Sequence, residues 1–596
     1  MTAPARPASP LETATIKRRA GLVLFLAVCA SLTIVSLLTG GFGRIGPDGD
    51  DVMRLVEVRD LLEGQAWFDL SQRRLGPDGG TLMHWSRLVD LPIAAIALIL
   101  TPLLGTDGAL SVAITIWPFA SVLMVTSGLV LGARSLGGRG VLLFTCLLGF
   151  AVLFRHFRFL PGAIDHHNVQ LGLMMISAAA LVARERPAAP MALSGACLAL
   201  AAAVGVEVHL FVAALAAFVA LDWAVAGAPA QRGAVVFGAS FAAVMAATFL
   251  ATVPPLDYGI ARCDAHSSVT LLAGLGGGAA FALAARLASE KTFRTRLMAL
   301  AGVAALCAVL VGVAGPECLG NPLNALSAQA RELWLARVDE ARPTLALLVG
   351  HLDEVLFRMG TQIAGLCAAL WMVGQGRDRR ARLLFVLLLT VSLLFAFYQT
   401  RFYVFGQLFA VLPLAVLAAR VQAGEAGPGW PRLAYLGVLL VSLPVVWGVA
   451  GKLLGPSDAP PLAELAAEAA TACDPEGTYA RLNTLPPGRI LAPASDAPGL
   501  LLETRHSVLY GHYHRNTAGI DTALTIFTAA PEDAHAGLLD ARVDYLLVCR
   551  ADADIQFFAG HAPEGLIAGI LRGDVPPWLT PAGSDGPADI YRVSER

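Results

Sequence analysis

Charged residues are scarce in this sequence. Of its 596 residues only 15% are Asp, Glu, Lys or Arg, whereas 56% are hydrophobic. A soluble protein carries about 25% charged residues, so the deficit indicates a surface that largely faces lipid. The formal net charge is −2, and no basic excess points to a nucleic acid as a partner.

Two kinds of motif are also missing. The nine cysteines contain no Cys-x-x-Cys pair, which argues against a zinc ribbon or a thioredoxin-like site. No Gly-x-x-x-x-Gly-Lys-Ser/Thr loop is present, which disfavours a cytoplasmic enzyme that uses nucleotide sugars. Five cysteines fall in apolar runs, and the other four allow the disulfides Cys263–Cys318 and Cys473–Cys549 in an oxidising compartment.

Long apolar runs fill most of the first 450 residues. A helix needs about 20 apolar residues to cross the hydrocarbon core. About thirteen stretches qualify, near 21–39, 109–132, 140–157, 168–183, 189–205, 207–225, 233–252, 269–287, 297–314, 344–372, 383–398, 403–420 and 431–450. The run 91–104 is shorter and contains two prolines, so we expect a re-entrant or interfacial segment there.

Arginine and lysine collect in alternate loops, for example Arg134 and Arg139, then Lys291 and Arg294. This pattern predicts a multi-pass protein of the inner (plasma) membrane with a cytoplasmic N-terminus. Residues 1–450 would form the transmembrane domain and residues 451–596 an extracytoplasmic, periplasmic domain. Strand-like runs at 489–492, 507–510 and 545–549 alternate with helical runs, so an α/β fold is expected for the second domain.

Ionisable residues gather in the loops predicted to lie outside. The first loop holds Asp48, Asp50 and Asp51 at the start of a helical pattern, where acidic residues, Asp48 above all, commonly satisfy free backbone N–H groups. The alternative is a site for a metal ion or a phosphate. The second loop holds Asp165, His166 and His167, which are costly to bury near a membrane unless they pair with each other or bind a metal ion.

Two further positions complete the pattern. Glu340 lies between two arginines, as it would on a solvated face with weak ion pairs. Arg401 lies between two spans at the outer boundary, where an arginine either snorkels or binds the phosphate of a lipid headgroup through its planar guanidinium.

Taken in order, these segments resemble the GT-C glycosyltransferases, in particular the catalytic subunit of oligosaccharyltransferase and its bacterial and archaeal single-subunit relatives. The similarity lies in four motifs and covers most of the chain. They are Asp50 with Arg59-Asp60, Arg158 with Gly162, Asp165 and His167, the stretch 338–343 around Glu340, and Arg401 in its Arg-Phe-x-x-Phe setting.

The resemblance implies a transfer of a sugar or oligosaccharide from a polyprenyl-phosphate or -diphosphate donor to a protein, lipid or glycan acceptor. A divalent metal ion, Mn²⁺ or Mg²⁺ with Zn²⁺ as a further candidate, would be held by Asp50, Asp165 and His167. The implied roles of the other residues are phosphate binding for Arg401 and Arg158, and catalysis for Asp50, Asp51 and Glu340.

The chain departs from the family in one motif. The Trp-Trp-Asp signature that reads the acceptor sequon is replaced by a stretch that ends in Asp496 and has no tryptophan. Asp496, His512 and His514 are the candidates for acceptor binding, although the stretch around the two histidines could equally be a hydrogen-bonded loop. A lipid or polysaccharide acceptor is therefore at least as well supported as a protein acceptor. A transporter of lipid-linked saccharides and a scaffold built on a degenerate enzyme are weaker alternatives.

Overall fold

The computed structural model describes residues 10–40, 43–46, 48–154, 156–183, 185–320, 323, 326–374, 379–427, 431, 433–455, 472–582 and 586–595. These residues form two compact units, each assembled from separate stretches of the chain. The membrane unit comprises residues up to 45, 86–320 and 343–456. The sheet unit comprises residues 46–85, 321–342 and 457–596.

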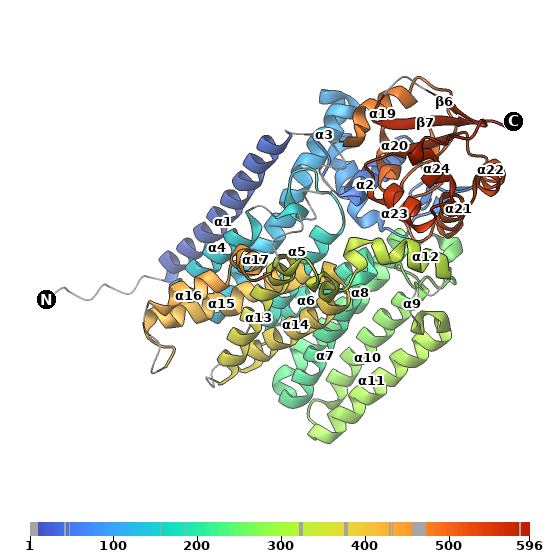
Figure 1. Ribbon diagram of the computed structural model, residues 1–596. Helices are drawn as coiled ribbons and strands as arrows, with labels where there is room; N and C mark the ends of the chain where they lie inside the picture. Colours follow the sequence, from blue (N-terminus) through green and yellow to red (C-terminus); the bar gives the residue numbers. More distant parts are fainter. Residues whose placement is uncertain are drawn as a thin grey trace. The chain divides into compact units, whose positions relative to one another are not determined.

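Apolar helices that contact one another make up the membrane unit (Figure 1). They are α1 (Pro10–Thr39), α3 (Arg87–Leu136), α4 (Arg139–Leu153), α5 (His167–Leu181), α6 (Ala188–Val204), α7 (His209–Ala226), α8 (Gln231–Thr252), α9 (Ser268–Leu271), α10 (Gly277–Ala288), α11 (Phe293–Ala314), α13 (Leu352–Gly374), α14 (Arg379–Tyr398), α15 (Tyr403–Ala423), α16 (Ala434–Val441) and α17 (Pro444–Leu454). A helix coincides with every predicted span.

Among the described residues, nine helical segments are long and apolar enough to cross a membrane. The pair α16 and α17, bent by 80°, makes a tenth if it is one span, and α4 and α6 are shorter apolar helices. This architecture confirms the predicted polytopic α-helical fold. Helix α5 is almost wholly buried, as expected for a helix surrounded by other helices.

Two boundaries differ from the sequence prediction. The run 344–372 does not form one helix: α13 begins at Leu352, after a short 3-10 helix and after Gly350, whose φ of 92° interrupts helical geometry. The run 91–104 is helical and belongs to α3, which breaks at Gly105 (φ 71°, ψ 171°).

A five-stranded sheet with strand order β4-β3-β5-β7-β6 organises the sheet unit. Its strands are β3 (Arg489–Leu491), β4 (Ser507–Val508), β5 (Tyr545–Cys549), β6 (Leu579–Pro581) and β7 (Ala588–Val593). Strand β3 pairs in parallel with β4 and β5, whereas β7 pairs antiparallel with β5 and β6. The helices are α2 (Gly49–Leu62), α12 (Ala328–Leu333), α19 (Pro475–Leu482), α20 (Ala497–Glu503), α21 (Thr517–Thr528), α22 (Pro531–Asp540), α23 (Ala553–His561) and α24 (Leu566–Arg572).

Two loops that are distant in sequence are built into the sheet unit. The first loop carries α2 and the short hairpin β1 (Ser71–Gln72) and β2 (Thr81–Leu82), and Leu75 forms an isolated parallel bridge with Val508. In the second loop, Trp334 belongs to the buried core beneath the sheet and donates a hydrogen bond from its indole to His512 Nδ1 at 2.9 Å. The predicted α/β fold therefore recruits two outer loops that the sequence did not assign to it.

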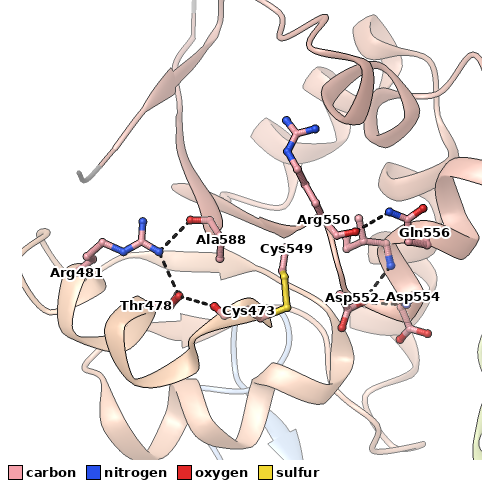
Figure 2. Close-up of a disulfide and its surroundings, with 10 residues drawn as sticks. Cys473, Thr478, Arg481, Cys549, Arg550, Asp552, Asp554, Gln556 and Ala588 are labelled. Carbon is pink, nitrogen blue, oxygen red and sulfur yellow. Dashed lines mark hydrogen bonds between the residues drawn. A yellow bond between two sulfur atoms is a disulfide. The ribbon is translucent and has the colours of Figure 1, made fainter. Parts of the chain in front are cut away.

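Both predicted disulfides are present. Cys263–Cys318 joins the loop before α9 to the segment after α11, with 5.0 Å between the two Cα atoms. Cys473–Cys549 joins the segment before α19 to the end of β5, and Figure 2 labels Asp552, just after β5, and Asp554, in the first turn of α23. Asp552 caps α23 by accepting hydrogen bonds from the backbone N–H groups of Asp554 and Ile555.

Candidate functional site

A buried ionic cluster lies where the chain enters α5. Its members, which we call the Asp165 cluster, are Arg158, Asp165, His166, His167 and Glu207. Each of the four that precede or begin α5 has 11% or less of its side chain exposed. Buried ionisable groups of this kind are costly unless they are paired, so their grouping indicates a functional site.

The turn before α5 presents Asp165 to its partners. Gly162 has φ 91°, a conformation that favours glycine, and its N–H binds the carbonyl of Ile114 in α3. The chain then returns so that Arg158 Nη1 lies 3.3 Å from Asp165 Oδ2. Arg158, predicted to bind the donor phosphate, therefore also supports the central carboxylate of the cluster.

Two imidazoles contact the same carboxylate. His166 Nδ1 lies 2.6 Å from Asp165 Oδ1, and His167 Nδ1 lies 3.0 Å from Oδ2. Burial by itself raises the pKa of Asp165, but the charges and hydrogen bonds of both imidazoles outweigh this effect and hold the pKa well below its usual range. Burial lowers the pKa of His166, and the opposing charges of Asp165 and Glu207 raise it to about 10. Asp165 is therefore a carboxylate at neutral pH.

Glu207 is the member that sequence reasoning missed. It comes from the short 3-10 helix Val206–Val208 between α6 and α7, and its Oε1 lies 3.5 Å from His166 Nε2. The available signal was its isolation, since no other Asp, Glu, Lys or Arg occurs between Arg186 and Asp222. Such a carboxylate next to a membrane span is a candidate for function by default.

The donor set suits a divalent metal ion. Ligand atoms of Asp165, His166 and His167 all lie within 4.8 Å of one another. One carboxylate oxygen together with imidazole nitrogen is a mixed set that accommodates Zn²⁺ and Mn²⁺, whereas Mg²⁺ prefers oxygen ligands alone. The residues present therefore fit a metal ion, and the third predicted ligand, Asp50, belongs to the sheet unit.

Arg401 lies in the short 3-10 helix Thr400–Phe402 that precedes α15. Its guanidinium donates to Gln399 Oε1 at 3.1 and 2.8 Å, and it interacts electrostatically with Glu207. Close by in sequence, Thr400 accepts a hydrogen bond from Arg358 at 2.8 Å. Arg401 and the Asp165 cluster thus belong to the same unit of the chain, the membrane unit.

The first outer loop places its acidic residues at the start of α2. Asp48 is the N-cap and accepts from the backbone N–H of Asp50 at 3.1 Å, so the capping interpretation holds for Asp48. Asp51 is buried, with 2% of its surface exposed, whereas Asp50 is half-buried. Glu340 is also half-buried, in the short 3-10 helix Asp339–Ala341.

The Arg59-Asp60 pair has a structural task within the sheet unit. Arg59 Nη1 donates to the carbonyl of Leu502 at 3.0 Å, and Asp60 Oδ2 accepts from Gln72 Nε2 at 2.7 Å. These contacts hold α2 against α20 and the β1–β2 hairpin.

The candidates for acceptor binding all lie in the sheet unit. Asp496 ends a short 3-10 helix that follows β3, and burial, followed by the charges of Asp552 and Asp554, raises its pKa to about 7. His512 is exposed and accepts from the Trp334 indole, while the ring of His514 lies 4.5 Å from that of His84. Both histidines thus contact an aromatic ring of the sheet unit, Trp334 for His512 and His84 for His514.

Comparison with known proteins gives structural matches alone. No profile of a known protein family and no curated protein sequence matches the chain. The oligosaccharyltransferase AglB of Archaeoglobus fulgidus, solved with an inhibitory peptide and a dolichol-phosphate, aligns with a TM-score of 0.64 and 15% identity over 97% of this chain and 74% of its own. A second structure of that enzyme, with Zn and sulfate, aligns with a TM-score of 0.57 and 15% identity over 97% of this chain and 73% of its own.

The structure of ArnT from Cupriavidus metallidurans, bound to undecaprenyl phosphate, aligns over 96% of this chain and 97% of the ArnT chain at 14% identity, with a TM-score of only 0.36. At 15% identity the two oligosaccharyltransferase structures show the fold of the chain and not its chemistry. The chain therefore has the membrane fold of the archaeal oligosaccharyltransferase, as the sequence predicted.

Proposed function

We propose that this protein is a membrane glycosyltransferase that moves a sugar or oligosaccharide from a polyprenyl-phosphate or -diphosphate donor to an acceptor on the extracytoplasmic side. The observation that carries the proposal is the Asp165 cluster, a buried set of ionisable groups next to membrane spans in a chain with the fold of an oligosaccharyltransferase. Dolichol-phosphate bound to that neighbour is the kind of lipid the proposal requires.

A cavity in the membrane unit supports a lipid-linked donor. It has a volume of about 650 Å³ and lies between α7, α8, α10 and α11. Its lining is mostly alanine, glycine and phenylalanine, with His209 among the few polar members. An isoprenoid chain matches such a lining because it offers branched apolar surface and no hydrogen-bonding groups.

The disulfides support the proposed orientation. Disulfides persist in oxidising compartments such as the periplasm and are rare in the cytosol. Cys263–Cys318 lies in two segments predicted to be outside, and Cys473–Cys549 lies in the C-terminal region predicted to be periplasmic. A cytoplasmic N-terminus follows from the same topology.

Each candidate residue has a proposed role. A divalent ion held by Asp165 and His167, with Asp50 as the third ligand predicted from the sequence, would act as a Lewis acid for the departing phosphate. Arg401 would bind the phosphate oxygens through its guanidinium. Arg158 would hold the Asp165 carboxylate in place, since their atoms lie 3.3 Å apart.

The acceptor would be activated from the sheet unit. Asp50 or Asp51 would orient the acceptor nucleophile or accept its proton, and Glu340 would polarise the acceptor or complete the metal shell. Asp496, with a pKa raised to about 7, can either donate or accept a hydrogen bond near neutral pH.

A lipid or polysaccharide acceptor is the second candidate. The positions that precede Asp496 are small, and Ala492 and Ala494 are fully buried beneath the sheet surface. No tryptophan is available there to read a peptide sequon. A transferase of the same fold with a non-protein acceptor accounts for this difference without changing the donor chemistry.

The test is turnover of polyprenyl-linked sugar donors by the full-length protein in nanodiscs, with and without EDTA. We expect metal-dependent release of polyprenyl phosphate, lost in Asp165→Ala and Arg401→Ala. Asp257→Ala is the matched control, because Asp257 also pairs with an arginine, Arg262 at 2.8 Å, in a more exposed position of the membrane unit. A folded protein that leaves a broad donor panel intact would overturn the proposal, as would full activity of Asp165→Ala.

A further inference from the structure

Glu207 has no role in the motifs that suggested the function, yet it lies in the Asp165 cluster. Its side chain is 12% exposed and belongs to an apolar part of the chain. A carboxylate in such surroundings costs free energy unless polar groups compensate for its lost hydration. Its neighbours therefore indicate what it is for.

His166 is placed between two carboxylates. Its Nδ1 lies 2.6 Å from Asp165 Oδ1 and its Nε2 lies 3.5 Å from Glu207 Oε1. An imidazole ligates a metal ion through the lone pair of a nitrogen that carries no proton. Both nitrogens of His166 are directed at carboxylates, which places this ring as a donor on both sides. The ligand role stays with His167, to which the sequence motif assigns it.

The other carboxylate oxygen of Glu207, Oε2, accepts a hydrogen bond. Gln170 Nε2, one turn into α5, lies 3.3 Å from Glu207 Oε2 and 3.2 Å from the carbonyl of Gly205. These contacts join the segment between α6 and α7 to the start of α5. The Glu207 carboxylate therefore contacts Gln170 on one side and His166 on the other, and the contact with Gln170 fixes its position relative to α5.

Gly205 makes this close approach feasible. Its φ of −173° is extended backbone that any residue adopts, so the conformation does not require glycine. A Cβ there would collide with Glu207 Oε2, and it would lie 2.8 Å from Gln170 Nε2 and 3.2 Å from His166 Cδ2. The missing side chain at Gly205 leaves room for the three side chains that support the cluster.

We propose that Glu207 is a positioning residue of the metal site: it holds His166 through Nε2, and His166 in turn fixes the Asp165 carboxylate for the ion that Asp165 and His167 share. The inference rests on the proposed metal-dependent function and names a residue outside its motifs. Carboxylates that orient the ligands of a metal ion commonly contribute 10- to 100-fold to metal affinity.

The experiment measures Mn²⁺ binding by electron paramagnetic resonance on the full-length protein in nanodiscs, without any donor. Glu207→Ala should weaken Mn²⁺ binding by about tenfold or more. Glu207→Gln should stay within about threefold of the wild type, because the amide oxygen still accepts from His166. Gly205→Ala should behave like Glu207→Ala, since the added methyl group displaces the same carboxylate.

Asp222→Asn is the matched control. Asp222 is a carboxylate of α7 with similar exposure, 13%, and it pairs with Arg186 and Arg380 at 2.7 Å each. Its variant should lose stability and keep wild-type Mn²⁺ affinity. Wild-type affinity in a folded Glu207→Ala protein, or equal losses in the Ala and Gln variants, would overturn the positioning role.

The outcome is separate from that of the transferase proposal, because Mn²⁺ binding needs no donor. Failure of the wild-type protein to bind Mn²⁺ would overturn this inference, and donor turnover that persists in EDTA would leave a metal-free transferase. Normal Mn²⁺ binding without donor turnover would retain the positioning role and remove the proposed reaction.

Discussion

Asp496 should make the stability of the protein depend on pH in an unusual direction. Carboxyl groups in proteins more often have a lowered pKa, but burial and the charges of Asp552 and Asp554 raise the pKa of Asp496 to about 7. The folded state therefore binds the Asp496 proton more tightly than the unfolded chain, whose pKa stays near 3.8. Stability from this group is greatest below pH 4 and is lost as the pH rises to about 7.

The size of the effect follows from the shift. One pKa unit corresponds to about 1.4 kcal/mol, so the rise in pKa amounts to about 4 kcal/mol of stability lost between acidic and neutral pH. Asp496→Asn removes the ionisation and keeps the shape. The variant should match the wild type near pH 4 and exceed it at pH 8 by about 4 kcal/mol.

The assay compares unfolding of wild-type protein and Asp496→Asn in nanodiscs between pH 4 and pH 8. Asp540→Asn, on the exposed surface of α22, is the control and should follow the wild type across the range. Asp496→Asn should also lose transfer of the sugar to the acceptor while it still binds the donor. A substitution that stabilises a protein and abolishes its activity is typical of a functional residue. A stability difference that does not change with pH would refute the reasoning about burial.

Three further predictions concern the cluster, the donor site and the fold. Arg158→Ala should destabilise the protein by about 1 to 3 kcal/mol in thermal unfolding, because buried Asp165 loses its guanidinium partner and keeps both imidazoles. Arg401→Lys should raise the KM for the lipid-linked donor by about tenfold in steady-state kinetics, since an ammonium group cannot bind phosphate bidentately; an unchanged KM would argue against phosphate binding. Replacing Cys473 and Cys549 by serine should cost about 4 kcal/mol, because the disulfide closes a sequence separation of 76 residues. The difference between wild type and variant should disappear under reducing conditions.

Local patterns were sufficient for much of the architecture. The apolar runs predicted a helix at every expected span, and β5 was predicted at its observed bounds, Tyr545–Cys549. Hydropathy and strand alternation are properties of consecutive residues, so they can be read along the chain. The start of α13 was wrong because apolar composition continues through Gly350, where the backbone turns.

Parts of the site could be predicted for the same reason. Arg158, Asp165 and His167 lie within ten positions, and one turn is enough to bring them together. Glu207 could not be predicted, because its contact with His166 joins residues on different helices and a lone carboxylate in an apolar run names no partner. Arg59 and Asp60 matched a motif by spacing, and the structure engages both in packing.

The sequence by itself determined that the chain is a polytopic membrane protein with an α/β domain, and which four loop segments carry its ionisable residues. Only the tertiary structure decided that residues 46–85 and 321–342 fold with the C-terminal sheet, and that Glu207 and Gly205 complete the support of His166. The physical reason is the sequence distance over which each property is set. Hydropathy patterns depend on residues that are neighbours in the sequence, whereas a buried ion pair depends on which distant helices pack together and exclude water.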